Sequence, residues 1–449
     1  MTMIDRNILF RSFDEQKDLM EDRIQLGIES YRKGYGRLNF VDQAGQPVRG
    51  VKVSVRQKSH DFKFGANIFK LNCFDTQEEN QRYEEAFFNL FNYAITPFYW
   101  NTFEPEEGKM RFDKDSPFID RRPPPEAVLE FCRQHGIRVK GHPLFWALML
   151  PDWLPQDQEA VKPYLTRRLQ QIAARYDGVI DCFDCVNEST EVPLLREEPN
   201  VNSRHYRNSI PLDGNYVAWT FRQADRFFLN SPLVINETTS VWLKFKQELS
   251  PFYMQIENLL SQKCRIDKVG LQYHLFVPQE QYADGAAQVF NPSHLYAVMD
   301  CYSRLGKPLQ ITEITVPGYG DNGDDIQAEA LYNLYRIWFS QRDVEAIVYW
   351  NLGDNCAIVQ DGWAEDKYKG GLLRSDFSEK PAYAVLQTLI QKEWQTNLDL
   401  ETADSFLYFK GFYGQYEITA EREGQVVNRE LRLSKNGFDT FTLSFPEVC

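Results

Sequence analysis

A regular alternation of short apolar runs with amphipathic segments, from about residue 60 to residue 350, most constrains the fold of this chain. Such alternation is typical of a parallel sheet whose strands are joined by helices. The predicted strands cover residues 62–68, 91–96, 137–142, 179–187, 233–236, 268–274, 309–313 and 346–350. The clearest helical patterns between them cover residues 126–135, 159–176, 216–229 and 326–340.

Eight strands at this spacing match the number needed for a closed (β/α)8 barrel, the TIM barrel of the α/β class. The alternative is a doubly wound open sheet. That fold commonly carries a glycine-rich phosphate loop after its first strand, and no such loop follows any of the eight runs. We therefore expect residues 60–395 to form a barrel, closed by a last helix over residues 381–394.

The two ends of the chain have a different pattern. Residues 14–33 predict a helix, and residues 38–41 and 51–55 alternate as the two strands of a β-hairpin. After the barrel, short strands with glycine turns are predicted at residues 406–409, 415–420, 430–433 and 441–445. We expect the segments 1–59 and 396–449 to join in a small accessory module resembling a β-sandwich.

The net charge of −14, from 50 basic and 64 acidic residues, argues against nucleic acid or an anionic membrane as a partner. No apolar run is long enough to span a bilayer, and residues 1–13 lack the pattern of a secretory signal. We expect a cytoplasmic protein if the sequence is full length, and a secreted one if a leader has been removed. The sequence carries no signal for an oligomeric state.

Cysteine and histidine patterns give no reason to expect a metal or another cofactor. Cys182 and Cys185 have the spacing of a redox or metal motif, but no second pair and no nearby histidine accompanies them. On a strand this offset points the two thiols to opposite faces, so we interpret them as plain buried cysteines. The six histidines include no pair at the spacing that a metal-dependent barrel hydrolase would need.

Two carboxylates end or interrupt apolar runs in the predicted barrel. Glu188 follows the fourth run and Glu313 lies in the seventh. Strand ends meet at one face of a barrel, so both side chains are expected in one site. Cleavage of a glycosidic bond needs one protonated carboxyl and one ionised carboxylate. We assign Glu188 as acid/base and Glu313 as nucleophile, with Asn187 placed to hold a sugar hydroxyl; the alternative is a pair of structural carboxylates in ion pairs.

A series of motifs follows the predicted strands in order. They are FKFGA at 62–66, Trp100 with EPEEG at 104–108, GHPLFW at 141–146, DCVNE at 184–188, GLQYH at 270–274, ITE at 311–313, and GLL at 371–373 with KPAY at 380–383. With this series the chain resembles glycoside hydrolase family 10, the endo-β-1,4-xylanase family, over residues 34–392. The resemblance implies a TIM barrel, a retaining mechanism and a carbohydrate substrate.

The resemblance also implies roles for individual side chains. Polar residues would hold the sugar and the nucleophile, and tryptophans would form apolar walls. The polar set is His142, Asn187, Gln272 and His274, and the tryptophans are Trp146, Trp350 and Trp363.

Three positions depart from the family pattern. Tyr99 stands where the family has lysine, Ala147 replaces a common histidine, and Thr315 replaces an aspartate that orients His274. We therefore expect Tyr99 to contact the substrate in a more apolar pocket. Xylan or xylo-oligosaccharides remain the first expected substrates. The alternatives are a short oligosaccharide or glycoconjugate, and a barrel that binds carbohydrate without cleaving it.

Overall fold

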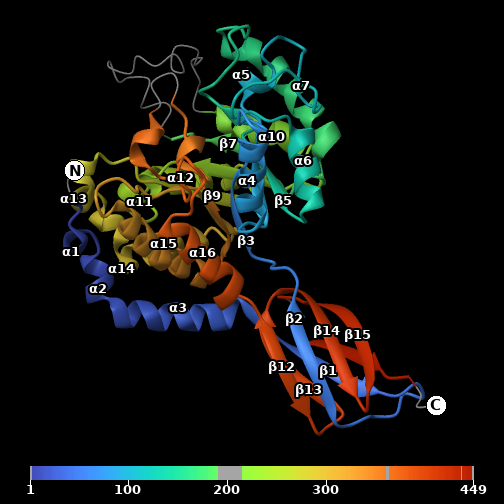
Figure 1. Ribbon diagram of the computed structural model, residues 1–449. Coiled ribbons are helices and arrows are strands. Elements are labelled where there is room, and N and C mark those ends of the chain that lie inside the picture. The colour runs from blue at the N-terminus through green and yellow to red at the C-terminus, as the bar shows by residue number, and fades with distance from the viewer. Residues whose placement is uncertain (1–2, 191–214, 360–363, 436, 447–449) are drawn as a thin grey trace. The chain divides into compact units, whose positions relative to one another are not determined.

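The computed structural model describes residues 3–190, 215–359, 364–435 and 437–446 (Figure 1). The chain divides into two compact units. The first consists of Met1–Lys17, Phe64–Trp338 and Asp343–Val385, and the second of Asp18–Lys63, Phe339–Arg342 and Leu386–Cys449. Across the described ranges, no helix combines the length and the apolar composition needed to cross a membrane.

The first unit contains a closed parallel barrel. Its eight strands are β3 (Lys63–Asn67), β4 (Tyr93–Pro97), β5 (Arg138–His142), β7 (Cys182–Asn187), β8 (Leu233–Glu237), β9 (Lys268–His274), β10 (Leu309–Thr315) and β11 (Val344–Tyr349). Each strand pairs with its neighbours, and the pairing of β5 with β7 closes the ring. A two-residue strand, β6 (Phe145–Trp146), adds to β7. The predicted (β/α)8 fold is confirmed, and all eight predicted runs are barrel strands.

Helices precede, connect and follow the strands of the barrel (Figure 1). The longer ones are α4 (Gln77–Phe88), α6 (Pro125–Gln134), α7 (Gln158–Tyr176), α10 (Tyr216–Asp225), α12 (Pro251–Ser261), α14 (Pro292–Ser303), α15 (Gly323–Ser340) and α16 (Pro381–Thr388). The short ones are α1 (Arg6–Leu9), α2 (Arg11–Glu15), α5 (Trp100–Phe103), α11 (Ser240–Leu243) and α13 (Tyr282–Ala286). Their starts follow local chemistry: Thr76 and Glu79 form a capping box on α4, and α6, α12 and α14 carry proline in the first turn.

Single turns complete the helical elements of the described ranges. Four are 3₁₀ turns, η1 (Gln279–Gln281), η2 (Ala287–Phe290), η3 (Asp354–Cys356) and η4 (Glu365–Tyr368), and η5 (Leu389–Glu393) is a π turn. The helix predicted over residues 381–394 is therefore α16 followed by η5.

A polar layer crosses the barrel interior. Lys140 on β5 forms an ion pair with Asp184 on β7 at 2.7 Å and donates a hydrogen bond to Gln310 on β10 at 2.9 Å. All three side chains are buried. Cys182 and Cys185 on β7 are buried free thiols, as expected.

The second unit contains two sheets that share one apolar core. The first sheet has the order β13 (Phe406–Phe412), β1 (Lys33–Val41), β16 (Asp439–Ser444). The second has the order β12 (Asn397–Thr402), β2 (Val51–Gln57), β14 (Gly414–Arg422), β15 (Gln425–Leu433). Side chains from both sheets fill the core, among them Leu38, Phe409, Val53 and Ile418. The sandwich-like accessory module is therefore confirmed, and α3 (Lys17–Tyr31) precedes its first strand.

The β-hairpin predicted in the N-terminal segment is wrong. β1 pairs with β13 and β16, whereas β2 pairs with β12 and β14 in the other sheet. Alternation identifies the buried face of a strand but not its partner, and two strands that face each other across a core alternate as hairpin neighbours do. Strand β12 was not predicted, because its residues are at most half-buried.

Candidate active site

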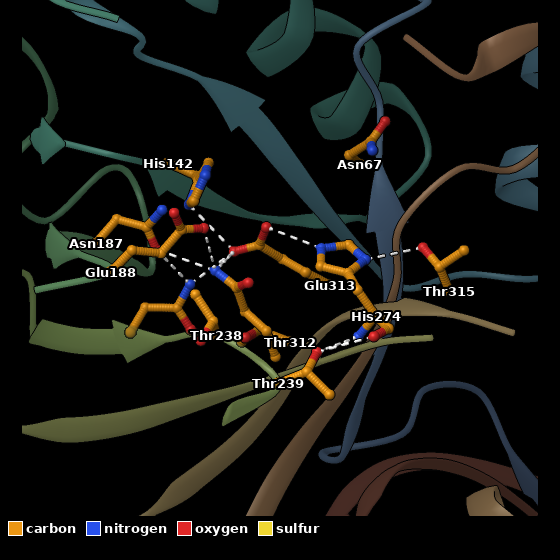
Figure 2. Close-up of polar contacts among 12 residues, drawn as sticks. Asn67, His142, Asn187, Glu188, Thr238, Thr239, His274, Thr312, Glu313 and Thr315 are labelled. Atoms are coloured by element: carbon orange, nitrogen blue, oxygen red, sulfur yellow. Dashed lines mark hydrogen bonds and ion pairs between the residues drawn. The ribbon is translucent and has the colours of Figure 1, made fainter. Parts of the chain in front are cut away.

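A cavity of about 380 Å³ lies at the carboxyl ends of the barrel strands. Nine of the ten predicted site residues line it: Tyr99, His142, Trp146, Asn187, Glu188, Gln272, His274, Glu313 and Trp350. The tenth, Trp363, lies outside the described residues. Figure 2 shows the polar side chains of this group converging from opposite sides of the barrel mouth.

The backbone turns sharply at both carboxylates. Glu188 directly follows β7 and has a φ of 54°, and Glu313 lies within β10 with the same φ of 54°. At Glu313 the register of β10 slips against both β9 and β11. A left-handed conformation at a non-glycine residue costs about 1–3 kcal/mol and persists where the surrounding structure enforces it. Such outliers cluster at functional sites.

Gln272 on β9 connects the two carboxylates. Its Nε2 donates to Glu188 Oε1 at 3.0 Å and to Glu313 Oε1 at 3.0 Å. With both oxygens on the same nitrogen, they lie within about 6 Å of each other. This separation is below the range of roughly 6.5–9.5 Å typical of carboxyl pairs in inverting glycosidases.

Glu313 is held by a further amide and an imidazole. Asn236, on β8 beyond β9, donates from Nδ2 to Glu313 Oε1 at 2.6 Å. Thr312 Oγ1 donates to Asn236 Oδ1 at 2.6 Å, which fixes the orientation of the amide. His274 Nε2 lies 3.5 Å from Glu313 Oε2. The side chain is nearly buried, so these contacts determine where its oxygens point.

Glu188 has a strongly perturbed acidity. Removal from water raises the pKa of its carboxyl, and the negative charge of Glu313 raises it further, to about 8. Hydrogen bonds donated by Gln272 and by Trp146 Nε1, the latter at 3.0 Å, act in the opposite direction. A carboxyl with this pKa is largely protonated at neutral pH and can donate a proton.

His142 is held in place by the polar layer of the barrel interior. Its Nδ1 lies 2.7 Å from Asp184 Oδ2, and Asp184 also pairs with Lys140. Burial alone would raise the pKa of Asp184, but the Lys140 charge and the His142 contact outweigh it and hold that pKa below its usual range. The same Nδ1 atom of His142 lies 3.9 Å from Glu313 Oε1.

His274 has a hydroxyl as its partner. Its Nδ1 lies 2.9 Å from Thr315 Oγ1 (Figure 2), and Thr239 Oγ1 accepts a hydrogen bond from its backbone N–H at 2.7 Å. The imidazole also stacks on Phe276, with ring centroids 4.6 Å apart. Thr315 can therefore orient the ring, although it supplies no negative charge.

Aromatic rings form one wall of the cavity. Tyr99 packs against His142 and Trp146, with centroid distances of 5.4 and 5.8 Å. Trp350 packs edge-on against both His142 and His274. Flat apolar surfaces of this kind suit the apolar faces of sugars.

Three residues that bear on the site were not predicted: Arg121 and Arg122, which line the cavity, and Asn236, which bonds to Glu313. Asn236 ends the apolar run of β8 as Asn187 ends that of β7, and this parallel was an available signal. Arg121 and Arg122 lie on the long segment between β4 and α6, and they make the pocket less apolar than Tyr99 alone suggested. Over the ranges that the structure describes, no three His, Cys, Asp or Glu side chains are grouped to hold a metal ion.

Comparison with known proteins gives consistent results. The family model "Glycosyl hydrolase family 10" matches residues 57–389. An anti-sigma-I factor, RsgI6, from Acetivibrio thermocellus is 25% identical over 422 residues, which is 90% of this chain and 47% of that protein. Endo-1,4-beta-xylanase B from Neocallimastix patriciarum is 25% identical over 261 residues, 58% of this chain and 28% of that protein. The chain thus spans less than half the length of these relatives.

Solved structures share the barrel. Xylanase 10B from Thermotoga petrophila, in complex with xylobiose, aligns with a TM-score of 0.55 at 20% identity and covers 74% of this chain and 95% of that one. At this identity the likeness shows the fold. The family model, in contrast, matches well over half of the sequence. The chain belongs to glycosyl hydrolase family 10.

Proposed function

We propose that this chain is a retaining β-glycoside hydrolase that acts on β-1,4-xylan or xylo-oligosaccharides. Glu313 is the nucleophile, Glu188 is the acid/base, and residues 60–395 are the catalytic region. The observation that carries the proposal is the pair of carboxylates joined by Gln272, with oxygens within about 6 Å of each other. Retaining enzymes need this short separation because the second carboxylate attacks the sugar directly.

The two carboxyls have different environments, as the two roles require. Glu188, with a pKa of about 8, keeps a proton at neutral pH and donates it to the glycosidic oxygen as that bond breaks. Glu313 attacks the anomeric carbon and forms a glycosyl ester. Glu188, now ionised, takes a proton from water, and the resulting hydroxyl displaces Glu313 from the sugar. The protons balance over the two steps.

The remaining polar residues position these groups. Asn236, Gln272 and His274 contact Glu313 from two neighbouring strands and hold it for in-line attack. Asn187 Oδ1 accepts hydrogen bonds from Asn236 and Gln272, so its amide nitrogen is available to a sugar hydroxyl. Such bonds strengthen in the transition state.

The assignment of xylose chains rests on relatives. Several similar proteins are named endo-1,4-beta-xylanases, and one similar structure holds xylobiose. The aromatic wall of Tyr99, Trp146 and Trp350 suits a β-linked sugar chain.

The second candidate is a barrel that binds carbohydrate without cleaving it. The relative that matches 90% of this chain is named an anti-sigma-I factor, not a glycosidase. Both carboxylates are present, however, and the loss of either would be the simplest route to an inactive barrel.

Hydrolysis of matched xylose and glucose substrates tests the proposal. Wild type, Glu313→Ala and Glu188→Ala are compared on aryl β-glycosides and β-1,4-linked oligosaccharides, and NMR identifies the first anomer released. We expect the β-anomer, loss of nearly all turnover in Glu313→Ala, and a larger loss on oligosaccharides than on activated aryl glycosides in Glu188→Ala. Wild-type turnover by Glu313→Ala would refute the nucleophile assignment, and binding without turnover by the wild type would favour the second candidate.

A further inference from the structure

Two adjacent arginines line the cavity and have no carboxylate partner among the residues that the structure describes. Arg121 and Arg122 are only 6% and 8% exposed, and both contribute to the cavity wall. Within the described ranges, neither has a carboxylate oxygen within ion-pair distance. Buried arginines are ordinarily paired, because an isolated charge loses much of its solvation.

Few of the donors on these side chains are used. Arg121 donates to Asn351 Oδ1 at 3.2 Å, and Arg122 donates to the backbone oxygen of Arg121 at 2.9 Å. The Nε atoms of both residues are buried, and no described residue accepts a hydrogen bond from them. A guanidinium offers five N–H donors, so most of this capacity is available.

The neighbouring acids are engaged elsewhere. Asp120 pairs with Lys70 at 2.7 Å. Glu365, which also lines the cavity, accepts a hydrogen bond from Asn351 Nδ2 at 3.0 Å. Asn351 thus lies between Glu365 and Arg121, and it binds both without bringing the charges together.

Both cations are held in place by rings. The Arg122 guanidinium lies 4.3 Å from the centroid of Tyr99, and both arginines lie over Phe69. Burial lowers the pKa of Arg122 to about 10, which still leaves it charged at neutral pH. A fixed, charged pair of guanidinium groups with unused donors is suited to oxyanions, planar or tetrahedral, because a guanidinium can bind two of their oxygens with two parallel hydrogen bonds.

We propose that Arg121 and Arg122 form a receptor for an anionic group, a carboxylate or a sulfate, carried by a sugar of the substrate chain. The part of this proposal that concerns a sugar chain rests on the proposed function. The charged sugar lies beside Tyr99, at the β4 and β11 side of the cavity, since Arg122 stacks on Tyr99 and Arg121 binds Asn351 just after β11. Tyr99, in place of the family's lysine, then serves as the platform that aligns Arg122.

Binding measured on an inactive variant tests the receptor independently of turnover. Glu313→Gln keeps oligosaccharides intact during calorimetry. The ligands are xylotriose, xylotriose with one glucuronic acid branch, the same branched compound with its carboxyl reduced to the alcohol, and a monosulfated xylotriose. At low salt we expect at least one anionic ligand to bind at least about tenfold more tightly than its neutral counterpart, the reduced branched compound or xylotriose. This difference in affinity should decrease as the salt concentration increases.

Substitutions locate the effect. Arg122→Met should abolish the preference for the anionic ligand, and Arg121→Gln, which retains a polar side chain, should weaken it. Lys114→Met removes the same charge from an exposed position paired with Glu130 and should leave the preference intact.

The outcomes separate the two proposals. The receptor proposal is overturned if the anionic ligands and their neutral counterparts bind with equal affinity. It is also overturned if the preference for the anionic ligand survives in both arginine variants. Preference for the carboxylate or for the sulfate supports the receptor and identifies its ligand. Absence of hydrolysis by the wild type would contradict only the proposed function, because the binding comparison does not depend on it.

Discussion

Above a pH of about 8, hydrolysis of a substrate with a poor leaving group should fall, because Glu188 then loses the proton it has to donate. Since the pKa is raised above its usual value, the acid form is present below pH 8 and is lost as the pH rises. About nine tenths of the plateau value of kcat/KM should remain at pH 7, and about one tenth at pH 9. Activated aryl glycosides should show a smaller decline, since they need less acid assistance.

The negative charge of Glu313 should account for a measurable part of the rise in the pKa of Glu188. Two unit charges no more than about 6 Å apart interact by about 2.8 kcal/mol or more at an effective dielectric constant of about 20, which corresponds to about two pKa units. In Glu313→Gln the pKa of Glu188 should therefore decrease by about two units, while the effect of burial stays. Carbon-13 NMR titration of labelled glutamate δ-carbons measures it, and Glu188→Gln in the same background assigns the signal.

Three results would refute this reasoning. One is a fall of kcat/KM above pH 8 (the basic limb of the pH profile) that is the same in Glu188→Gln as in the wild type. Another is a Glu188 carboxyl in the wild type that titrates near the usual glutamate pKa of about 4.3. The third is a pKa that stays the same when Glu313 loses its charge.

Two further substitutions probe the surrounding contacts. Trp146→Phe removes the indole donor to Glu188, a bond that lowers the carboxyl pKa, so the basic limb should move to higher pH by about one unit or less in the same pH profile. Gly270→Ala would place a methyl 2.3 Å from Asn236 Oδ1; the amide must move, and kcat/KM should fall by about tenfold or more. Gly285→Ala, where the nearest atom is 3.4 Å away, is the control, and unchanged activity in Gly270→Ala would contradict the role of Asn236.

The barrel was predictable because its strands are short apolar runs separated by amphipathic helices. A parallel strand buried on both faces must be apolar, so a carboxylate such as Glu313 within a run is conspicuous. Asn236, a polar residue directly after the apolar residues of β8, carries the same signal.

Other features depend on tertiary structure that local pattern does not encode. The slip of register at Glu313 is set by pairing with β9 and β11 at once, and strict alternation would have placed that side chain differently. Arg121 and Arg122 lie on a long loop, where hydrophobic periodicity does not predict which way a side chain points. The partners of β1 and β2 are likewise determined by strands distant in the sequence.

The accessory sandwich has a consequence for synthesis on the ribosome. Gln57, at the end of β2, bonds to Thr396, 339 residues later in the chain. At about 5–20 residues per second, the early strands wait roughly 20–70 s for their partners, while the whole barrel sequence emerges between them. During that time β1 and β2 present unpaired edges and apolar faces, which are prone to pair with another chain. The nascent protein is therefore most prone to such pairing before its final strands are made.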